Sequence, residues 1–158
     1  MASGDREAIR RVTPVLKRLG RAGVFGNGSR MKFIVNLLVA IHTVATGEGL
    51  VLAERVGLDL NQVMEVVSSG LARSESWQVR GPLIVTHQYE VAGGPIRNWI
   101  KDINLIADFV NAAGAVTPLF DQSRTLFEEA DRQGLSDWDA VAVHAVLKQM
   151  RPPAPTAS

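Results

Sequence analysis

A proline-free apolar stretch from Gly26 to Arg55 constrains the fold of this chain more than any other feature. It opens with the small residues Gly-Asn-Gly-Ser and then has no glycine between Gly28 and Gly47. Such a pattern predicts one long helix with an accessible N-terminus, about 40 Å long if it reaches Arg55. Because its sides are almost entirely apolar, we expect this helix to lie inside a bundle and not on its surface.

Lys32 and Asn36 stand out against that apolar background. They are four residues apart and therefore share one helix face, which Thr43 and Gly47 continue. One interpretation is structural, with a lysine that reaches water near the helix end and an asparagine bonded to neighbouring backbone. The other is functional, with an ammonium and a carboxamide that hold a carboxylate or hydroxyl and move a proton. The pattern alone leaves both interpretations open.

Composition narrows the classes of protein to consider. The chain has 158 residues, of which 46% are hydrophobic, which favours one folded domain. Its 17 basic and 16 acidic residues give a net charge of +1 and no electrostatic reason to expect nucleic acid as a partner. The chain has no cysteine, which excludes disulfides and thiolate metal sites and fits a cytoplasmic protein. Three scattered histidines form no local metal motif, so no metal site is predicted.

The apolar run at residues 33–45 also raises the question of a membrane span. It is shorter than the roughly 20 residues that a spanning helix needs, and Asn36 and His42 interrupt it. We therefore expect a bundle helix and no membrane partner.

The remaining sequence predicts further helices and no strand of useful length. Apolar residues recur at three- and four-residue spacing between Gly and Pro breaks, with an Asp59–Gln62 capping box and with Pro95 and Pro118 in first helical turns. Ser136 or Asp137 is expected to cap the last helix. The prediction is an all-α bundle of about six or seven helices around one long central helix. Residues 151–158 are rich in Pro and Ala and are predicted to be a disordered tail.

Lys101 and Asp102 form a second polar pair in an otherwise apolar helix. An ordinary exposed charge pair is one explanation, and a role at a binding site is the other.

Three motifs in this order resemble the β-hydroxyacid dehydrogenase family, which includes 3-hydroxyisobutyrate dehydrogenase, tartronate semialdehyde reductase and, more distantly, 6-phosphogluconate dehydrogenase. The first is the Gly-x-Gly turn followed by Lys32 four residues after Gly28 and by Asn36 four residues later. The second is Lys101-Asp102-Ile-Asn-Leu, and the third is the Gly134–Asp139 segment. The resemblance covers residues 8–150. Val35 stands where the family usually has a second asparagine, which leaves the substrate open.

The resemblance implies roles for five residues. Lys32 would be the general acid/base that exchanges a proton with the substrate hydroxyl, and Asn36 and Gly28 would bind the substrate. Lys101 and Asp102 would lie at the cofactor end of the cleft. The implied cofactor is NAD or NADP, and the implied substrate is a small hydroxy acid.

The resemblance also implies a domain organisation. Residues 1–25 would be the remnant of the end of an N-terminal Rossmann domain, and residues 26–150 the helical substrate and dimerisation domain, like the C-terminal domain of 6-phosphogluconate dehydrogenase. The dinucleotide-binding domain itself, with its Gly-rich fingerprint, would be a partner outside this chain. We expect a homodimer. The alternative is a helical dimerisation module without enzyme activity of its own, and an imine reductase is disfavoured because the lysine is present.

Overall fold

Seven α-helices and one short 3-10 turn make up the part of the chain that the structure describes, a computed structural model covering residues 5–19, 28–90 and 93–150. The helices are α1 (Arg6–Leu19), α2 (Gly28–Arg55), α3 (Leu60–Ser69), α4 (Glu75–Val85), α5 (Ile96–Ala112), α6 (Pro118–Arg132) and α7 (Val143–Gln149), with the 3-10 turn η1 (Ala140–Ala142) before α7. These ranges contain no β-strand. The all-α prediction is confirmed.

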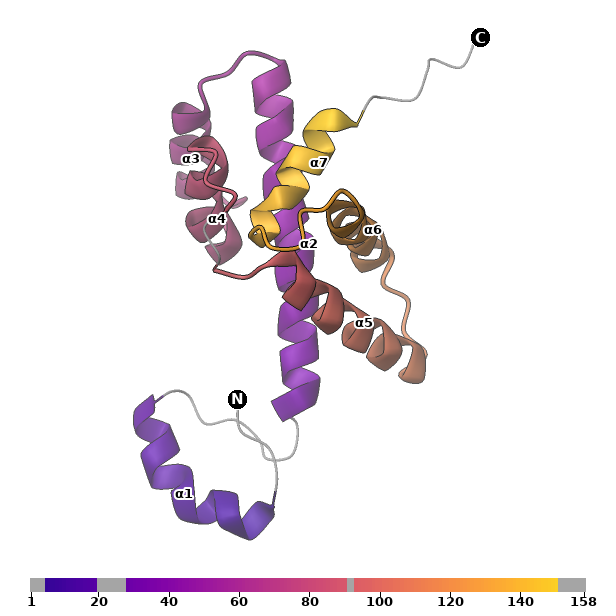
Figure 1. Ribbon diagram of the computed structural model, residues 1–158. Coiled ribbons are helices and arrows are strands. Elements are labelled where there is room, and N and C mark those ends of the chain that lie inside the picture. Colours follow the sequence, from indigo (N-terminus) through magenta and orange to yellow (C-terminus); the bar gives the residue numbers. More distant parts are fainter. Residues whose placement is uncertain (1–4, 20–27, 91–92, 151–158) are drawn as a thin grey trace.

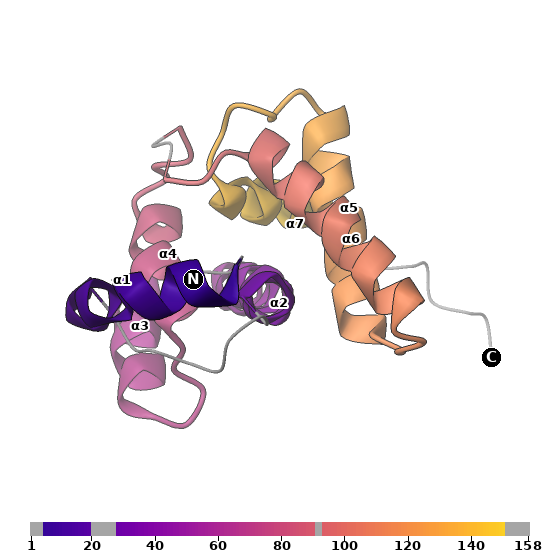
Figure 2. The same cartoon turned by 90° about the horizontal axis from the view of Figure 1, so that it is seen from below.

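The long helix α2 is the axis of the bundle, as predicted (Figure 1). Helices α3 and α4 pack on one side of it and α5, α6 and α7 on the other, which Figure 2 shows from below. Helix α1 lies apart from the other six near the N-terminal end of α2. Pro14 lies inside α1, which continues past it to Leu19. The predicted tail at 151–158 lies outside the described residues.

Small side chains on α2 allow the other helices to approach it closely. A Cβ at Gly47 would lie 3.1 Å from Leu147 Cδ1 and 3.6 Å from the Cα of His144, so α7 packs on the bare backbone there. The largest core cluster contains buried residues of α2, α5, α6 and α7, and Phe120 and Phe127 are its largest members. A second cluster joins Leu50, Trp77, Ile84 and Val141.

The burial of α2 is uneven, which corrects the expectation of a fully enclosed helix. Its buried residues begin at Ala40, while Met31, Val35 and Leu38 near the N-terminus are exposed. By length and composition alone, α2 with an 18-residue window of mean hydropathy 1.6 is long and apolar enough to cross a membrane, so the length of the apolar run does not exclude a span, contrary to the sequence-based expectation. Its buried face nevertheless packs against α4, α5, α6 and α7, as the core helix of a bundle does.

Several helix ends follow the sequence signals. Asp59 caps α3 by accepting hydrogen bonds from the backbone N–H groups of Asn61 and Gln62. Gly114 and Gly134, just after α5 and α6, have φ values of 62° and 81°, which favour glycine. Asp139 caps η1, the turn that leads into α7, by accepting from Val141 N, and α7 itself has no side-chain cap, so the prediction of Ser136 or Asp137 is wrong.

The first prediction concerns the core around α2. Leu50→Ala should lower the free energy of unfolding by about 2–5 kcal/mol, because Leu50 has no exposed surface and its truncation leaves a cavity. Leu71→Ala is the matched control, with an effect within about 0.5 kcal/mol, because Leu71 is fully exposed. Urea unfolding followed by circular dichroism measures both, and equal losses would contradict the position of α2 in the core.

Candidate functional site

Lys32, Asn36 and Asp102 meet on one side of the bundle. Asp102 Oδ1 accepts a hydrogen bond from Lys32 Nζ at 3.1 Å, and Asp102 Oδ2 accepts one from Asn36 Nδ2 at 2.9 Å. A single carboxylate on α5 therefore joins the two polar residues of α2. We call these three residues the Lys32 cluster. The sequence treated Asp102 as part of a separate pair with Lys101, and the fold unites it with Lys32 and Asn36.

The cluster forms because α5 runs back along the first half of α2. The rings of Phe33 and Phe109 lie 5.3 Å apart, and Ile103 and Ile106 of α5 are buried in the core. Since Ile103 faces the core, the preceding residue, Asp102, lies at the edge of the helix interface, where it can reach α2. Apolar packing thus sets the register that brings the carboxylate to the lysine.

Neither sequence interpretation of Lys32 and Asn36 describes their surroundings fully. The Lys32 side chain is 49% exposed, which agrees with the structural interpretation of a lysine that reaches water near the helix end. Asn36 donates to a carboxylate on another helix and not to neighbouring backbone. A half-exposed ammonium can meet an incoming ligand, while Asp102 and Asn36 restrict where it points.

The other two predicted site residues lie outside these contacts. Gly28 is the first residue of α2, about one turn before Lys32, and the turn that precedes it is outside the described ranges. Lys101 is exposed, and within residues 5–19, 28–90 and 93–150 it makes no side-chain hydrogen bond or ion pair. The structure therefore brings Asp102 to Lys32 and leaves Lys101 facing solvent beside them.

A second polar group, which we call the Arg80 cluster, lies further along the same face of α2. Arg80 of α4 donates a hydrogen bond to the Thr43 hydroxyl, and its guanidinium lies over the Trp99 ring, 5.2 Å from the ring centroid. Thr43 donates its own proton to the carbonyl of Val39 at 2.7 Å. Ser76 Oγ is 3.4 Å from the Thr43 hydroxyl oxygen.

The effect of burial on the pKa of Arg80 is only partly offset by a nearby opposite charge. Desolvation lowers the pKa of the guanidinium, and the through-space attraction of Asp139 acts in the other direction. The two carboxylate oxygens of Asp139 already accept hydrogen bonds from backbone, Oδ2 from Gly94 N at 2.8 Å and Oδ1 from Val141 N at 3.1 Å.

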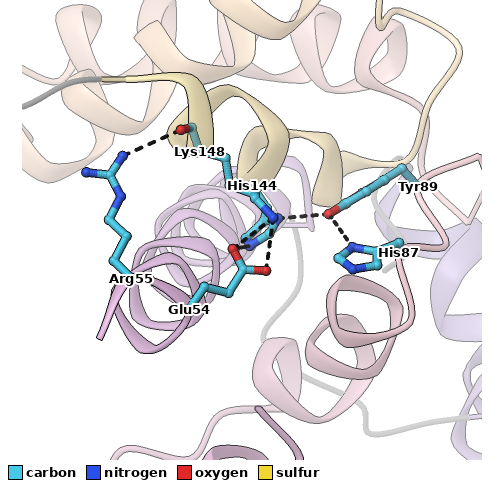
Figure 3. A network of polar contacts seen from close by, with 6 residues as sticks. All are labelled: Glu54, Arg55, His87, Tyr89, His144 and Lys148. Atoms are coloured by element: carbon cyan, nitrogen blue, oxygen red, sulfur yellow. Dashed lines mark hydrogen bonds and ion pairs between the residues drawn. The ribbon is translucent and has the colours of Figure 1, made fainter. Parts of the chain in front are cut away.

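A third polar network lies at the C-terminal end of α2 (Figure 3). The Tyr89 hydroxyl lies 2.9 Å from His144 Nδ1 and 3.2 Å from His87 Nδ1. His144 Nε2 is 3.7 Å from Glu54 Oε2, which also pairs with Lys148 at 3.0 Å. The chain of contacts leads from the exposed His87 to a histidine with no exposed surface.

His144 is held neutral in the fold. Burial lowers its pKa from 6.5 to about 4, against the attraction of Glu54 and with help from Lys148 and His87. Desolvation and the nearby Glu54 raise the pKa of Tyr89. With about 22 residues of helix between Lys32 and Glu54, roughly 33 Å at 1.5 Å per residue, this network is separate from the Lys32 cluster.

Comparison with known proteins decides the family. The sequence model of the family described as "NAD-binding of NADP-dependent 3-hydroxyisobutyrate dehydrogenase" matches residues 26–147. The chain belongs to this family. The match includes the whole Lys32 cluster, and membership supports the predicted cofactor, NAD or NADP.

Proteins with related sequences or structures are named as dehydrogenases or reductases. The chain is 31% identical to glyoxylate/succinic semialdehyde reductase 2 of Arabidopsis thaliana over 94% of this chain and 42% of that protein. It is 31% identical to L-threonate dehydrogenase of Escherichia coli strain K12, over 90% and 49%. The crystal structure of 3-hydroxyisobutyrate dehydrogenase from Salmonella typhimurium is 29% identical, with a TM-score of 0.82 over 92% of this chain and 53% of that one. The chain thus spans about half the length of these relatives.

Sequence reasoning missed Arg80, Tyr89 and His144 as members of polar clusters. None of them belongs to a short motif, because each acquires its partners from a different helix or loop. His42, which interrupts the apolar run of α2, is exposed, and His144 is buried. The one available signal was a histidine on the apolar stripe of the last helix.

The second prediction is a pH dependence of stability. Because the folded pKa of His144 is lowered, the unfolded chain binds its proton first, and stability is fully present above pH 6.5 and is lost as the pH falls towards about 4. The loss from this residue should approach about 3 kcal/mol. Urea unfolding between pH 7.5 and 4 measures it.

His144→Phe separates this residue from general acid effects. The variant keeps an aromatic ring in the site but cannot titrate, so its stability should fall less between pH 6.5 and 4 than that of the wild type. His42→Phe is the control, since His42 is exposed, and it should keep the wild-type slope. Parallel curves for His144→Phe and the wild type would exclude His144 as the source.

Proposed function

We propose that this chain is the C-terminal helical part of an NAD(P)-dependent dehydrogenase that acts on a small 3-hydroxy acid. The observation that carries the proposal is the Lys32 cluster, in which the lysine and asparagine of the family motif share one carboxylate partner. Family membership supports dehydrogenase chemistry, and the position in the second half of the longer relatives is inferred from the order of the motifs. A cytoplasmic location remains a prediction from the absence of cysteine.

In this role Lys32 moves the proton of the substrate hydroxyl. A bound nicotinamide would supply the hydride chemistry at the substrate carbon, and in the oxidation direction Lys32 Nζ would accept the proton of the substrate hydroxyl. In the reduction direction the ammonium returns the proton to the new alkoxide. Asp102 is a positioning residue, since its Oδ1 holds Lys32 Nζ at 3.1 Å.

Asn36 supplies a fixed hydrogen-bonding group for the substrate. Its Nδ2 is committed to Asp102, which fixes the amide plane, and among the described residues its Oδ1 has no hydrogen-bond partner. That oxygen can accept a hydrogen bond from a substrate hydroxyl next to Lys32. Gly28, without a side chain at the start of α2, allows a ligand to approach the backbone closely.

The residues present fit a dinucleotide that is held mainly elsewhere. The Lys32 cluster lies at the surface of the bundle, with Lys32 49% and Asp102 28% exposed, and Lys101 faces solvent beside it. Lys101 would contact the nicotinamide end, and Asp102 would contribute there through Lys32. The sequence has no Gly-rich phosphate fingerprint, so the adenine and pyrophosphate need the N-terminal Rossmann domain. We infer that residues 1–25 are the end of that domain, which agrees with the separate position of α1 (Figure 1).

A homodimer is the assembly that we propose. The exposed side of α2 carries a row of apolar residues in its first turns, namely Met31, Ile34, Val35 and Leu38, and two more exposed apolar residues, Leu52 and Val56, lie at or just beyond its C-terminal end. A row of this length on one rigid helix is self-complementary across a two-fold axis. The alternative function, a dimerisation module without activity, uses the same row, so only an activity measurement separates the two.

The third prediction tests the catalytic lysine. In a fusion of this chain to the dinucleotide domain of a relative, Lys32→Ala should lower kcat for oxidation of a small 3-hydroxy acid by about 10²–10⁴-fold, because the proton acceptor is removed. Lys148→Ala is the matched control with unchanged kcat, since Lys148 pairs with Glu54 at the other end of α2. An active fusion that tolerates Lys32→Ala would refute the catalytic assignment, and inactivity with every dinucleotide domain would favour the module.

The fourth prediction tests the assembly. Light scattering at micromolar concentration should give twice the chain mass of 17.1 kDa, and Leu38→Glu should shift the protein to monomer because it places a charge in the apolar row. Leu71→Glu is the control and should leave the dimer intact, because Leu71 is fully exposed and outside the row. A wild-type monomer would reject the proposal.

A further inference from the structure

We propose that the Arg80 cluster is an anion subsite that binds a carboxylate at the far end of an elongated organic acid whose other end lies at the Lys32 cluster. The inference rests on the proposed function for its link to the reaction, and on Arg80, Thr43 and Trp99 for the subsite itself. It assigns this chain a preference for substrates with a second anionic group over neutral ones of the same shape.

Two helices independently place the Arg80 cluster next to the Lys32 cluster. On α2, Thr43 lies seven residues after Asn36 on the same face, about 10 Å along the axis. On α5, Trp99 lies three residues before Asp102, about one turn away. Thr43 contacts Arg80, and Trp99 lies beneath its guanidinium. A ligand extended along α2 from Lys32 would therefore reach the arginine.

The guanidinium has donors to spare and a charge that the protein does not neutralise by contact. An arginine carries five N–H donors in a fixed fork that suits a carboxylate, and Arg80 uses one of them on Thr43. In the described part of the chain, no carboxylate lies within ion-pair distance of it. Asp139, the acid whose charge acts on it through space, has both oxygens bonded to backbone N–H groups.

The contacts around Arg80 orient its guanidinium, and among the described residues they occupy only one of its N–H donors. The Trp99 ring supports one flat face of the guanidinium by a cation–π contact, which leaves its edge for planar hydrogen bonds. The Thr43 proton is bound to the carbonyl of Val39, so its hydroxyl oxygen can only accept from Arg80. A partly buried arginine held in this way carries an unmet desolvation cost, which an incoming carboxylate would offset.

Binding of succinate to the full 158-residue chain tests the subsite without cofactor or turnover. Succinate should shift the NMR signals of the Arg80 Nε–H and Trp99 Nε1–H groups saturably, with a dissociation constant on the order of millimolar. Succinamide, a neutral molecule of the same shape, should not shift them at the same concentrations and constant ionic strength. Absence of a saturable shift with succinate would overturn the proposal.

Two variants at one position locate the binding. Arg80→Gln should weaken succinate binding at least about tenfold, and Arg80→Lys should be intermediate because it keeps the charge but loses the fork. The matched control is Arg132→Gln, which removes an exposed arginine paired with Glu129 and should bind succinate as the wild type does. Circular dichroism establishes that each variant is folded. If Arg80→Gln does not fold, wild-type affinity in folded Arg80→Lys would still overturn the proposal.

Failure of the anion subsite can be distinguished from failure of the proposed dehydrogenase function. If the fusion enzyme shows no dehydrogenase activity but succinate binds at Arg80, the proposed function fails and the anion subsite stands. If the fusion is active while succinate does not bind, or binds folded Arg80→Gln as tightly as the wild type, the subsite fails alone.

Discussion

The close packing of α2 against its neighbours is the constraint on which the other features depend. At Gly47 the backbone of α2 meets α7 closely, since a Cβ would lie 3.1 Å from Leu147 Cδ1, tighter than an ordinary van der Waals contact. That contact fixes α7 and, through the core that α7 shares with α5 and α6, the position of α5. The position of α5 in turn decides whether Asp102 reaches Lys32 and Asn36.

One rigid helix therefore carries three polar sites along its length. The Lys32 cluster is near its N-terminus, the Arg80 cluster meets it at Thr43, and the Glu54–His144 network lies at its C-terminal end. Because all three share one helix, their spacing is set by helical geometry rather than by flexible loops. This spacing is the basis of the proposal that the Lys32 and Arg80 clusters bind the two ends of one ligand.

Much of the fold could be predicted from local sequence signals, because helix periodicity and helix-ending residues act over a few residues. The extent of α2, the cap at Asp59 and the ends at Gly114 and Gly134 follow from such signals, whereas Pro95 is the N-cap of α5 and does not lie in its first turn as predicted. Burial could not be predicted in the same way. The first turns of α2 are as apolar as the rest, yet they are exposed because the described part of the chain packs too little against them.

For the candidate site, too, only features within a single helix could be predicted from the sequence. The i, i+4 spacing of Lys32 and Asn36 is a property of one helix, and the family resemblance singled out Asp102. That all three meet, that Arg80 stacks on Trp99 and that His144 is buried depend on how separate helices pack, which no single segment encodes. Asp139 illustrates the difference, because its carboxylate caps η1 and also accepts from Gly94 N, 45 residues earlier in the chain.

The most direct test of the central claim, that Lys32, Asn36 and Asp102 act as one site, is a double-mutant cycle in the active fusion enzyme. The kcat/KM values of Asn36→Ala, Asp102→Asn and the double variant would be compared with the wild type. Residues that share hydrogen bonds should show a coupling energy of about 0.5–3 kcal/mol, so the double variant should lose less activity than the two single losses combined. Strict additivity of the two losses would contradict a shared site.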